Sequence, residues 1–169
     1  AFRDCLGNEI TKTGMDDLMA YENKLSLPVE TSGITAEWLE AALSGYAPGV
    51  RVRGFAFEDS INTTCTKIRI RLDLENNRPD APIPPTVILK GGFEPHSRKM
   101  WGMHKNEALS YATLMTQLGL RVPTPYFAAW DEDALQGIVI MEDLKARGVE
   151  FSSPLRPYDF DHAHKRVRA

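Results

Sequence analysis

Lys90 is the residue of this sequence whose type and position best fit a chemical role. It ends the short apolar run Thr86-Val87-Ile88-Leu89, which follows prolines and precedes Gly91-Gly92. Prolines before and glycines after an aliphatic run predict a short buried strand. A lysine on a covered strand is costly to bury unless a carboxylate pairs with its charge. The fold is therefore expected to bring an acidic residue to Lys90.

Glu107 is the best candidate for that acidic residue. It lies in the segment 97–118, which predicts a helix, and an apolar stripe continues from it at spacings of three and four: Tyr111, Leu114 and Leu118. An ammonium group held by a helix carboxylate can reach the α- and β-phosphates of a nucleotide. Taken alone, the pair favours an ion pair that only orients the helix, because strand-end lysines and helix glutamates are common.

The elements before the lysine strand predict a helix and a hairpin. Residues 1–34 predict a peripheral arm with a short helix at 15–21. Thr35 then fits a helix N-cap, and the helix after it carries an apolar stripe: Trp38, Leu39, Ala42 and Leu43. Strands follow at 50–57 and 65–74. In the second strand, aliphatic residues alternate with Lys67, Arg69, Arg71 and Asp73, which predicts one face in the core and one in water.

The segment Glu58–Thr64 predicts the loop of this hairpin. It contains hydroxyl and amide side chains and no glycine. In a nucleotide-binding hairpin its backbone N–H groups and hydroxyls would cover the phosphates, with four residues in contact: Ser60, Asn62, Thr63 and Thr64. On its own the loop favours a polar turn without a ligand.

The remaining elements complete an α+β domain. A proline-rich connection at 75–85 leads into the lysine strand. After the helix at 97–118, strands at 126–131 and 135–141 predict a second hairpin. Together these segments predict a five-stranded antiparallel sheet with one covering helix, in which the lysine and glutamate side chains share a cleft.

Composition limits the classes of function. The chain has 169 residues, of which 43% are hydrophobic and 25% charged, as in an ordinary globular protein. Its net charge of −3 gives no footprint for nucleic acid or an anionic membrane, and no apolar run is as long as a membrane span. Only Cys5 and Cys65 are present, so we expect a reducing compartment, by default the cytoplasm.

The order of elements, followed by Met141-Glu142-Asp143-Leu144 after an apolar strand, resembles the N-terminal lobe of the protein-kinase-like small-molecule phosphotransferases. This family includes aminoglycoside phosphotransferases, choline kinases and ecdysteroid-kinase-like proteins. The resemblance implies a nucleotide-binding lobe at 35–144 and ATP with Mg²⁺ as cofactors. It also implies that Lys90 contacts the α- and β-phosphates and that Glu107 holds it.

By the same resemblance, Met141 would lie at the back of the adenine pocket. The Glu142 carbonyl and the Leu144 N–H would hydrogen-bond the adenine edge, and residues 60–66 would cover the phosphates. Residues 145–169 would lead out of the lobe into a linker helix. These implied contacts give every predicted site residue a place around one nucleotide.

The family's catalytic loop, His-Gly-Asp followed by His and Asn, and its later metal-binding aspartate do not occur in this sequence. No catalytic residue and no metal ligand are therefore predicted here. Asp161, His162 and His164 do not share a helix face, so they predict no metal site. His104 is predicted to be a half-exposed packing residue.

We expect this chain to be the front portion of an ATP-dependent phosphotransferase that acts on a hydroxyl group of a small molecule. Its helical lobe would lie outside this chain, which alone would bind nucleotide weakly and catalyse nothing. The surface that normally faces that lobe would be exposed or would pair with another copy. The alternative is a non-catalytic α+β binding or interaction module of the same shape.

Overall fold

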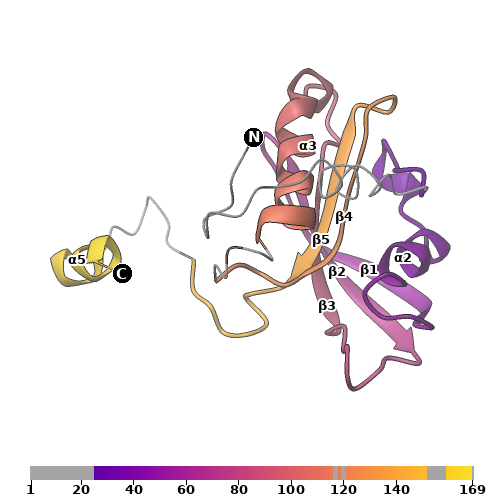
Figure 1. The fold of residues 1–169 in the computed structure, drawn as a ribbon, viewed down its shortest axis with the longest axis horizontal. Helices are drawn as coiled ribbons and strands as arrows, with labels where there is room; N and C mark the ends of the chain where they lie inside the picture. The colour runs from indigo at the N-terminus through magenta and orange to yellow at the C-terminus, as the bar shows by residue number, and fades with distance from the viewer. Residues whose placement is uncertain (1–24, 116–117, 119–120, 152–158, 169) are drawn as a thin grey trace, which may run out of the picture.

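In a computed structural model, which describes residues 25–115, 118, 121–151 and 159–168, five antiparallel strands form one sheet in the order β1-β2-β3-β5-β4 (Figure 1). The predicted α+β class with a five-stranded antiparallel sheet is confirmed. The strands are β1 (Arg51–Asn62), β2 (Thr66–Glu75), β3 (Thr86–Gly91), β4 (Pro125–Asp131) and β5 (Gln136–Glu142).

The two faces of the sheet carry different residues and different helices. One face, called the α2 face here, is almost wholly aliphatic and includes Ile70, Val87 and Ile140, which lie side by side or nearly so in the strand register. The other, called the α3 face, includes Ile88 and Lys90 of β3. Because side chains alternate along a strand, each strand contributes to both faces.

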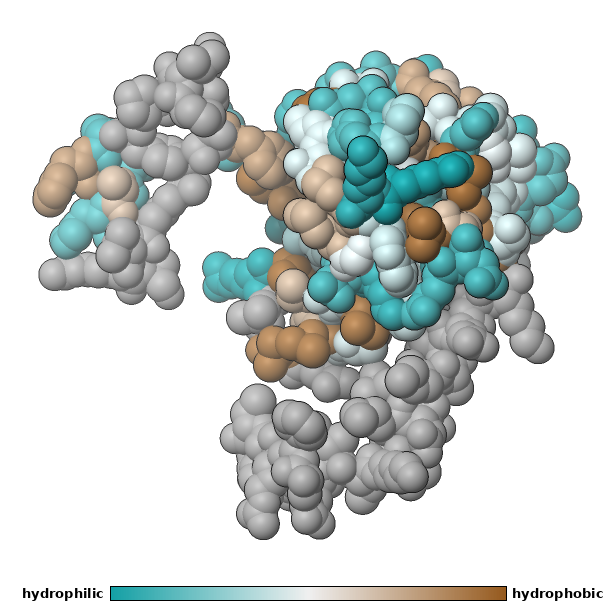
Figure 2. Space-filling view, turned by 90° about the horizontal axis from the view of Figure 1, so that it is seen from above, coloured by the Kyte–Doolittle hydropathy of each residue, from teal (hydrophilic) through white to brown (hydrophobic). Residues whose placement is uncertain are grey.

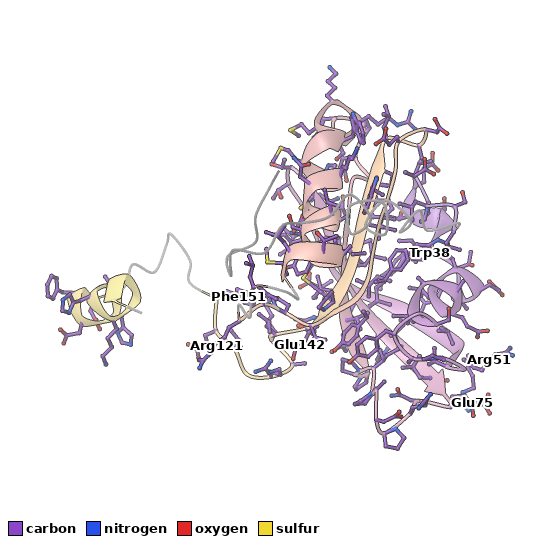
Figure 3. The ribbon with its side chains drawn as sticks, in the orientation of Figure 1. Trp38, Arg51, Glu75, Arg121, Glu142 and Phe151 are labelled. Carbon is purple, nitrogen blue, oxygen red and sulfur yellow. The ribbon has the colours of Figure 1, made fainter. Side chains whose placement is uncertain are left out.

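Helix α2 (Ala36–Leu43) covers the α2 face, and the predicted N-cap is confirmed: the Thr35 hydroxyl accepts a hydrogen bond from the Trp38 N–H at 3.1 Å. The predicted apolar stripe of α2 is buried. Trp38 points from α2 towards the sheet and meets the Phe127 ring edge-on, with centroids 5.6 Å apart (Figure 3). This layer is the main hydrophobic core of the described residues.

The segment before α2 also belongs to this core. Leu27 and Ile34 are buried, and the Trp38 indole N–H donates to the Ser26 carbonyl at 3.0 Å. A single 3-10 turn, η1 (Thr31–Gly33), lies between them. Residues 25–34 are therefore packed against the sheet, whereas the sequence predicted a peripheral arm up to residue 34.

Helix α3 (Trp101–Leu109) packs over β4 and β5 on the α3 face (Figure 1). A 3-10 turn, η2 (Ser97–Met100), precedes it, and a π-helical turn, η3 (Ser110–Leu114), follows. The residues of this helix that face the sheet are His104, Ala108 and Thr113, a step of four followed by a step of five. The five-residue step is the π turn.

The π turn explains why Leu114 and Leu118 are not buried as predicted. They are 54% and 44% exposed, because the extra residue rotates the following turn away from the sheet. The Ser110 hydroxyl donates to the Asn106 carbonyl, and the Thr113 hydroxyl donates to the Leu109 carbonyl, each at 2.7 Å. Such back-bonding from helix hydroxyls bends helices and accompanies the change of register here.

His104 is buried, with 4% of its surface exposed, whereas the sequence predicted a half-exposed residue. Two glycines account for the difference: Gly137 in β5, and Gly92 directly after β3. A Cβ atom on Gly137 would lie 2.5 Å from the His104 carbonyl oxygen, and one on Gly92 would lie 2.9 Å from the His104 ring. Without those Cβ atoms, the first turn of α3 lies directly on the backbone of the sheet.

The hairpin of β1 and β2 is longer than predicted. The strands run to Asn62 and from Thr66, so only residues 63–65 form the turn. A register shift between Phe57 and Asp59 marks a bulge in β1. Ser60 and Asn62, predicted in a loop, therefore lie in a strand, and alternation assigns each of their side chains to one face of the sheet.

The second predicted hairpin is confirmed, although Leu135 belongs to its turn, with a φ of 51°. Helix α5 (Phe160–Arg168) lies apart from the sheet in Figure 1, and its described side chains are exposed. The predicted helix at 15–21 and Cys5 lie outside the described residues. In the described ranges, no helix is long and apolar enough to cross a membrane.

Candidate functional site

The Lys90 ammonium group is in direct contact with a Glu107 carboxylate oxygen. β3 carries the lysine and α3 carries the glutamate. The contact therefore joins the central strand of the sheet to the helix that packs over β4 and β5. The side chains are 18% and 31% exposed, so the pair is partly shielded and still reachable from solvent. The predicted pair is therefore brought together, on the α3 face.

The backbone after Lys90 is held by Gln136, which is 1% exposed. Its side-chain oxygen accepts from the Gly92 N–H at 2.9 Å, and its amide donates to the Gly92 carbonyl at 3.4 Å. The same amide donates to the Pro28 carbonyl at 3.0 Å. A buried side chain with its hydrogen bonds satisfied limits the movement of the strand end that carries Lys90.

Met141 lies on the α3 face beside Ile88 and is 6% exposed. The Tyr111 hydroxyl donates to its sulfur at 3.8 Å, and burial raises the pKa of that hydroxyl. Val139, two residues before Met141 in β5, is the cross-strand partner of Lys90. Met141 therefore forms an apolar wall that connects α3 with the strand carrying the lysine.

The segment after Met141 leaves the sheet at the end of β5, where Glu142 is labelled in Figure 3. Burial raises the pKa of Glu142, but hydrogen bonds from Arg147 and from the Thr124 N–H outweigh it and lower the pKa overall. The Leu144 N–H makes no hydrogen bond to another described residue. It is thus an unpaired backbone donor, among the described residues, just after the end of β5.

Asp143 is a site residue that the sequence did not predict. It is 4% exposed, and its carboxylate accepts from the Arg69 guanidinium at 3.3 Å, the Thr86 hydroxyl at 3.1 Å and the Lys145 N–H at 3.1 Å. Arg69 and Thr86 lie on the α3 face of β2 and β3. These contacts connect the segment after β5 to two other strands. An arginine on an otherwise exposed strand face was the only signal for this partner.

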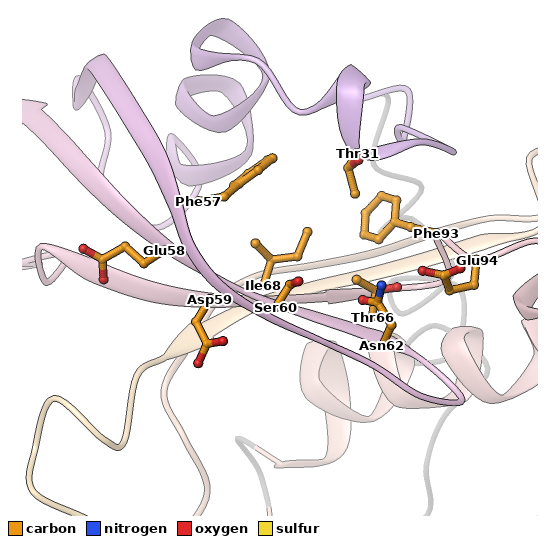
Figure 4. Close-up of a pocket in the computed structure, with 10 residues that line it drawn as sticks. All are labelled: Thr31, Phe57, Glu58, Asp59, Ser60, Asn62, Thr66, Ile68, Phe93 and Glu94. Carbon is orange, nitrogen blue, oxygen red and sulfur yellow. The ribbon is translucent and has the colours of Figure 1, made fainter.

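Ser60 and Asn62 do not lie beside Lys90. They pair with Ile68 and Thr66 and share the α2 face with them. There they line a cavity of about 360 Å³ together with the rings of Phe57 and Phe93 (Figure 4). These two side chains, predicted to contact phosphates at Lys90, therefore lie on the opposite face of the sheet from Lys90, because the β1 strand continues through the predicted loop.

Thr63 and Thr64 do belong to the short turn, at the end of the hairpin. The Thr63 carbonyl contacts the His96 ring nitrogen at 2.9 Å, which joins the turn to the chain before α3. Of the four predicted loop residues, Thr63 and Thr64 are the two that lie in the turn between β1 and β2.

Two polar atoms behind Lys90 are buried and make no hydrogen bond within the described part of the chain: His104 Nε2 and Ser97 Oγ. Both side chains lie against Gly92. Burial lowers the pKa of His104, with an opposing effect from Glu107 and a further lowering by Lys90. A neutral imidazole therefore lies next to the ion pair, on the buried side of α3.

Among the described residues, no group of three His, Cys, Asp or Glu side chains could hold a metal ion. The Asp159 carboxylate instead accepts a hydrogen bond from the His162 N–H at 2.8 Å, as an N-terminal cap of α5 does. Comparison of the chain with models of protein families, with curated proteins and with solved structures finds no match.

Proposed function

We propose that the α3 face binds ATP and is the nucleotide-binding lobe of a phosphotransferase acting on a hydroxyl group of a small molecule. The observation that carries the proposal is the partly shielded Lys90–Glu107 pair beside the Met141 wall. Lysine on a strand, held by a helix carboxylate, is the arrangement that positions nucleotide phosphates in protein-kinase-like enzymes. The resemblance noted in the sequence supplies the remainder of the proposal.

The distribution of groups across this face suits the parts of a nucleotide. The Leu144 N–H, just after the end of β5, is a donor for the hydrogen-bonding edge of a base. Ile88 lies on β3 between its cross-strand neighbours, Arg69 on β2 and Met141 on β5. It would offer an apolar surface under the base. Two residues further along β3, Lys90 offers a cation to the phosphates. The site would therefore offer a donor and an apolar surface for the adenine base at one end and a cation for the phosphates at the other.

Mg²⁺ would reach this site with the nucleotide, since the described residues hold no carboxylate set for it. Chemistry on the γ-phosphate needs a base and metal ligands. The resemblance assigns both to a helical lobe. The proposed contribution of this chain is therefore to hold and orient ATP, while the acceptor alcohol would bind elsewhere in the enzyme.

Calorimetric titration of this chain with ATP and Mg²⁺ tests the proposal. Lys90→Ala should weaken ATP binding by about tenfold or more, because a charge-assisted hydrogen bond contributes roughly 1.5–3 kcal/mol. Glu107→Ala should weaken it less, because the lysine remains and only loses its orientation. In the full-length enzyme, the same order should appear in turnover.

Arg78→Ala is the matched control, because Arg78 is an exposed cation in the connection that precedes β3. It should leave both affinity and melting temperature unchanged. Equal loss of affinity in all three variants, or loss explained wholly by unfolding, would contradict the nucleotide site. A wild-type chain that binds no adenine nucleotide would favour the alternative of a non-catalytic binding module.

A further inference from the structure

Lys67 is the direct cross-strand neighbour of Lys90. The two residues oppose each other on β2 and β3, so both side chains leave the same side of the sheet, the α3 face. Opposed residues on neighbouring strands have Cβ atoms about 5 Å apart, and like charges placed this way destabilise a sheet. Two ammonium groups in this register are therefore a cost that the folded protein bears.

The other cations of this face each have a carboxylate partner. Lys90 contacts Glu107, Arg69 lies 3.0 Å from Asp143, and Arg71 lies 3.4 Å from Glu58. Lys67 is exposed, and no carboxylate of the described residues lies within ion-pair distance of it. Its neighbour on the other side, across β1, is Ile61, which carries no charge. The pattern leaves one uncompensated cation beside the proposed phosphate contact.

We infer that Lys67 and Lys90 together hold the phosphate chain of the ligand, with Lys67 as a second phosphate-binding residue. This inference rests on the proposed function and extends it to a residue of β2 for which the sequence predicted no contact with the ligand. A bound polyphosphate neutralises the pair, so the repulsion present without ligand becomes attraction with it.

The spacing of the two lysines selects the class of ligand. Two ammonium groups that start one strand apart can contact neighbouring phosphates of a diphosphate or triphosphate at the same time. A nucleoside monophosphate has only one phosphate group. If that group contacts Lys90 as proposed, no second phosphate remains for Lys67. The site should therefore distinguish ATP and ADP from AMP, and Lys67 should carry much of that difference.

The test is calorimetric titration of wild type, Lys67→Gln and Lys67→Arg with ATP, ADP and AMP, each with Mg²⁺, and with inorganic tripolyphosphate. Lys67→Gln should weaken ATP, ADP and tripolyphosphate by about tenfold and AMP by about threefold or less. Lys67→Arg keeps the charge and should restore most of the affinity. Arg71→Gln, on the same strand and face, is the matched control.

A second measurement separates a binding role from a structural one. Without ligand, Lys67→Gln should raise the melting temperature, because it removes the repulsion with Lys90. With saturating ATP, the order should reverse, because wild type gains more from the ligand. A residue that only supports the hairpin would lower the melting temperature in both conditions.

The outcomes distinguish this inference from the proposed function. If Lys90→Ala loses ATP affinity and Lys67→Gln does not, the inference is overturned while the proposed function stands. If both lysine variants lose tripolyphosphate, but wild type binds ATP no better than tripolyphosphate, the two-lysine site stands and the adenine site fails. Wild type that binds none of the four probes overturns both.

Discussion

The two faces of the sheet are built from the same five strands and differ in the side chains they carry and in how fully they are covered. On the α2 face, the side chains of β2, β3 and β5 are mostly aliphatic, and Ile70, Val87 and Ile140 are completely buried in the core that also contains α2. On the α3 face, the helix covers only β4 and β5, and the half formed by β2 and β3 carries charged residues. One face is closed, and the other is closed over half its width.

The difference separates the part of the sheet that stabilises the fold from the part where we propose that the nucleotide binds. Completely buried aliphatic side chains contribute the largest share of folding free energy, whereas half-buried charges contribute little and cost something to hold. Seen from above, the described surface mixes hydrophilic areas with smaller hydrophobic ones, without one continuous apolar area (Figure 2). Substitutions should accordingly affect stability on the α2 face and ligand binding on the α3 face.

The largest effect is expected from truncating a side chain of the α2 face. Ile70→Ala should lower the free energy of unfolding by roughly 3 kcal/mol, because it removes a completely buried side chain and leaves a cavity. Ile88→Ala, on the half-open α3 face, should lower it by only about 1 kcal/mol. Urea unfolding of both variants measures the difference.

The comparison between the faces would be broken if the two isoleucine variants were equally unstable. That result would mean that the α3 face carries a second complete core. If Ile88→Ala instead leaves stability nearly unchanged while weakening ATP binding, the division between a stabilising face and a binding face becomes sharper.

A smaller loss of stability is expected from adding one methyl group under α3. A Cβ atom at Gly137 would lie within 3 Å of backbone atoms of His104 and Lys105, so Gly137→Ala should destabilise by about 2 kcal/mol. Gly102→Ala, inside α3 with open space around it, should instead stabilise by about 0.5 kcal/mol, since alanine is the better helix former.

Thermal unfolding of the two glycine variants, together with ATP titration, checks this contrast. Gly137→Ala should also weaken ATP binding, because it moves α3, and with it Glu107, away from Lys90. A Gly137→Ala variant with wild-type stability would show that α3 can shift over the sheet at little cost. The close approach of helix and strand would then not be what holds the ion pair.

Much of the α2 face could be predicted from the sequence, because strand alternation and helix spacing are local patterns. The aliphatic positions of β2 and the buried stripe of α2 follow directly from periods of two and 3.6 residues. The contact of Lys90 with Glu107 was predicted for a related reason: a buried charge needs a partner, and Glu107 begins an apolar stripe at helical spacing in the next predicted element.

The α3 face was harder to predict, because its details depend on backbone geometry that no local period records. The π turn that exposes Leu114 and the bulge that accompanies the extension of β1 through Asn62 each shift the register by one residue. A shift of one residue moves a side chain to the other face, as Ser60 illustrates. Asp143 was missed because its partner, Arg69, is distant in the sequence and lies on a strand face predicted to be in water.

The smallest effect is the pH dependence that His104 should add to stability. Burial lowers the pKa of His104 below its ordinary value of 6.5, and Lys90 lowers it further, while Glu107 opposes. Below pH 6.5 the unfolded chain therefore takes up a proton that the folded chain does not. Stability should fall as the pH drops from 6.5 towards the pKa of the folded state, and it should be independent of this group above 6.5.

Unfolding of wild type and of His104→Gln, followed in urea from about pH 7.5 to about pH 5, isolates this contribution as a difference between the two curves. The slope below pH 6.5 should be smaller in the variant. If His104→Gln keeps the full slope, the imidazole takes up a proton in the folded protein as readily as in the unfolded chain, and in acid α3 then presents a cation to Glu107 in competition with Lys90. That competition would weaken the ion pair in acid, so ATP binding by wild type would decline over the same pH range in which the slope appears. The neutral imidazole expected here predicts instead that ATP affinity stays constant across that range while stability alone declines.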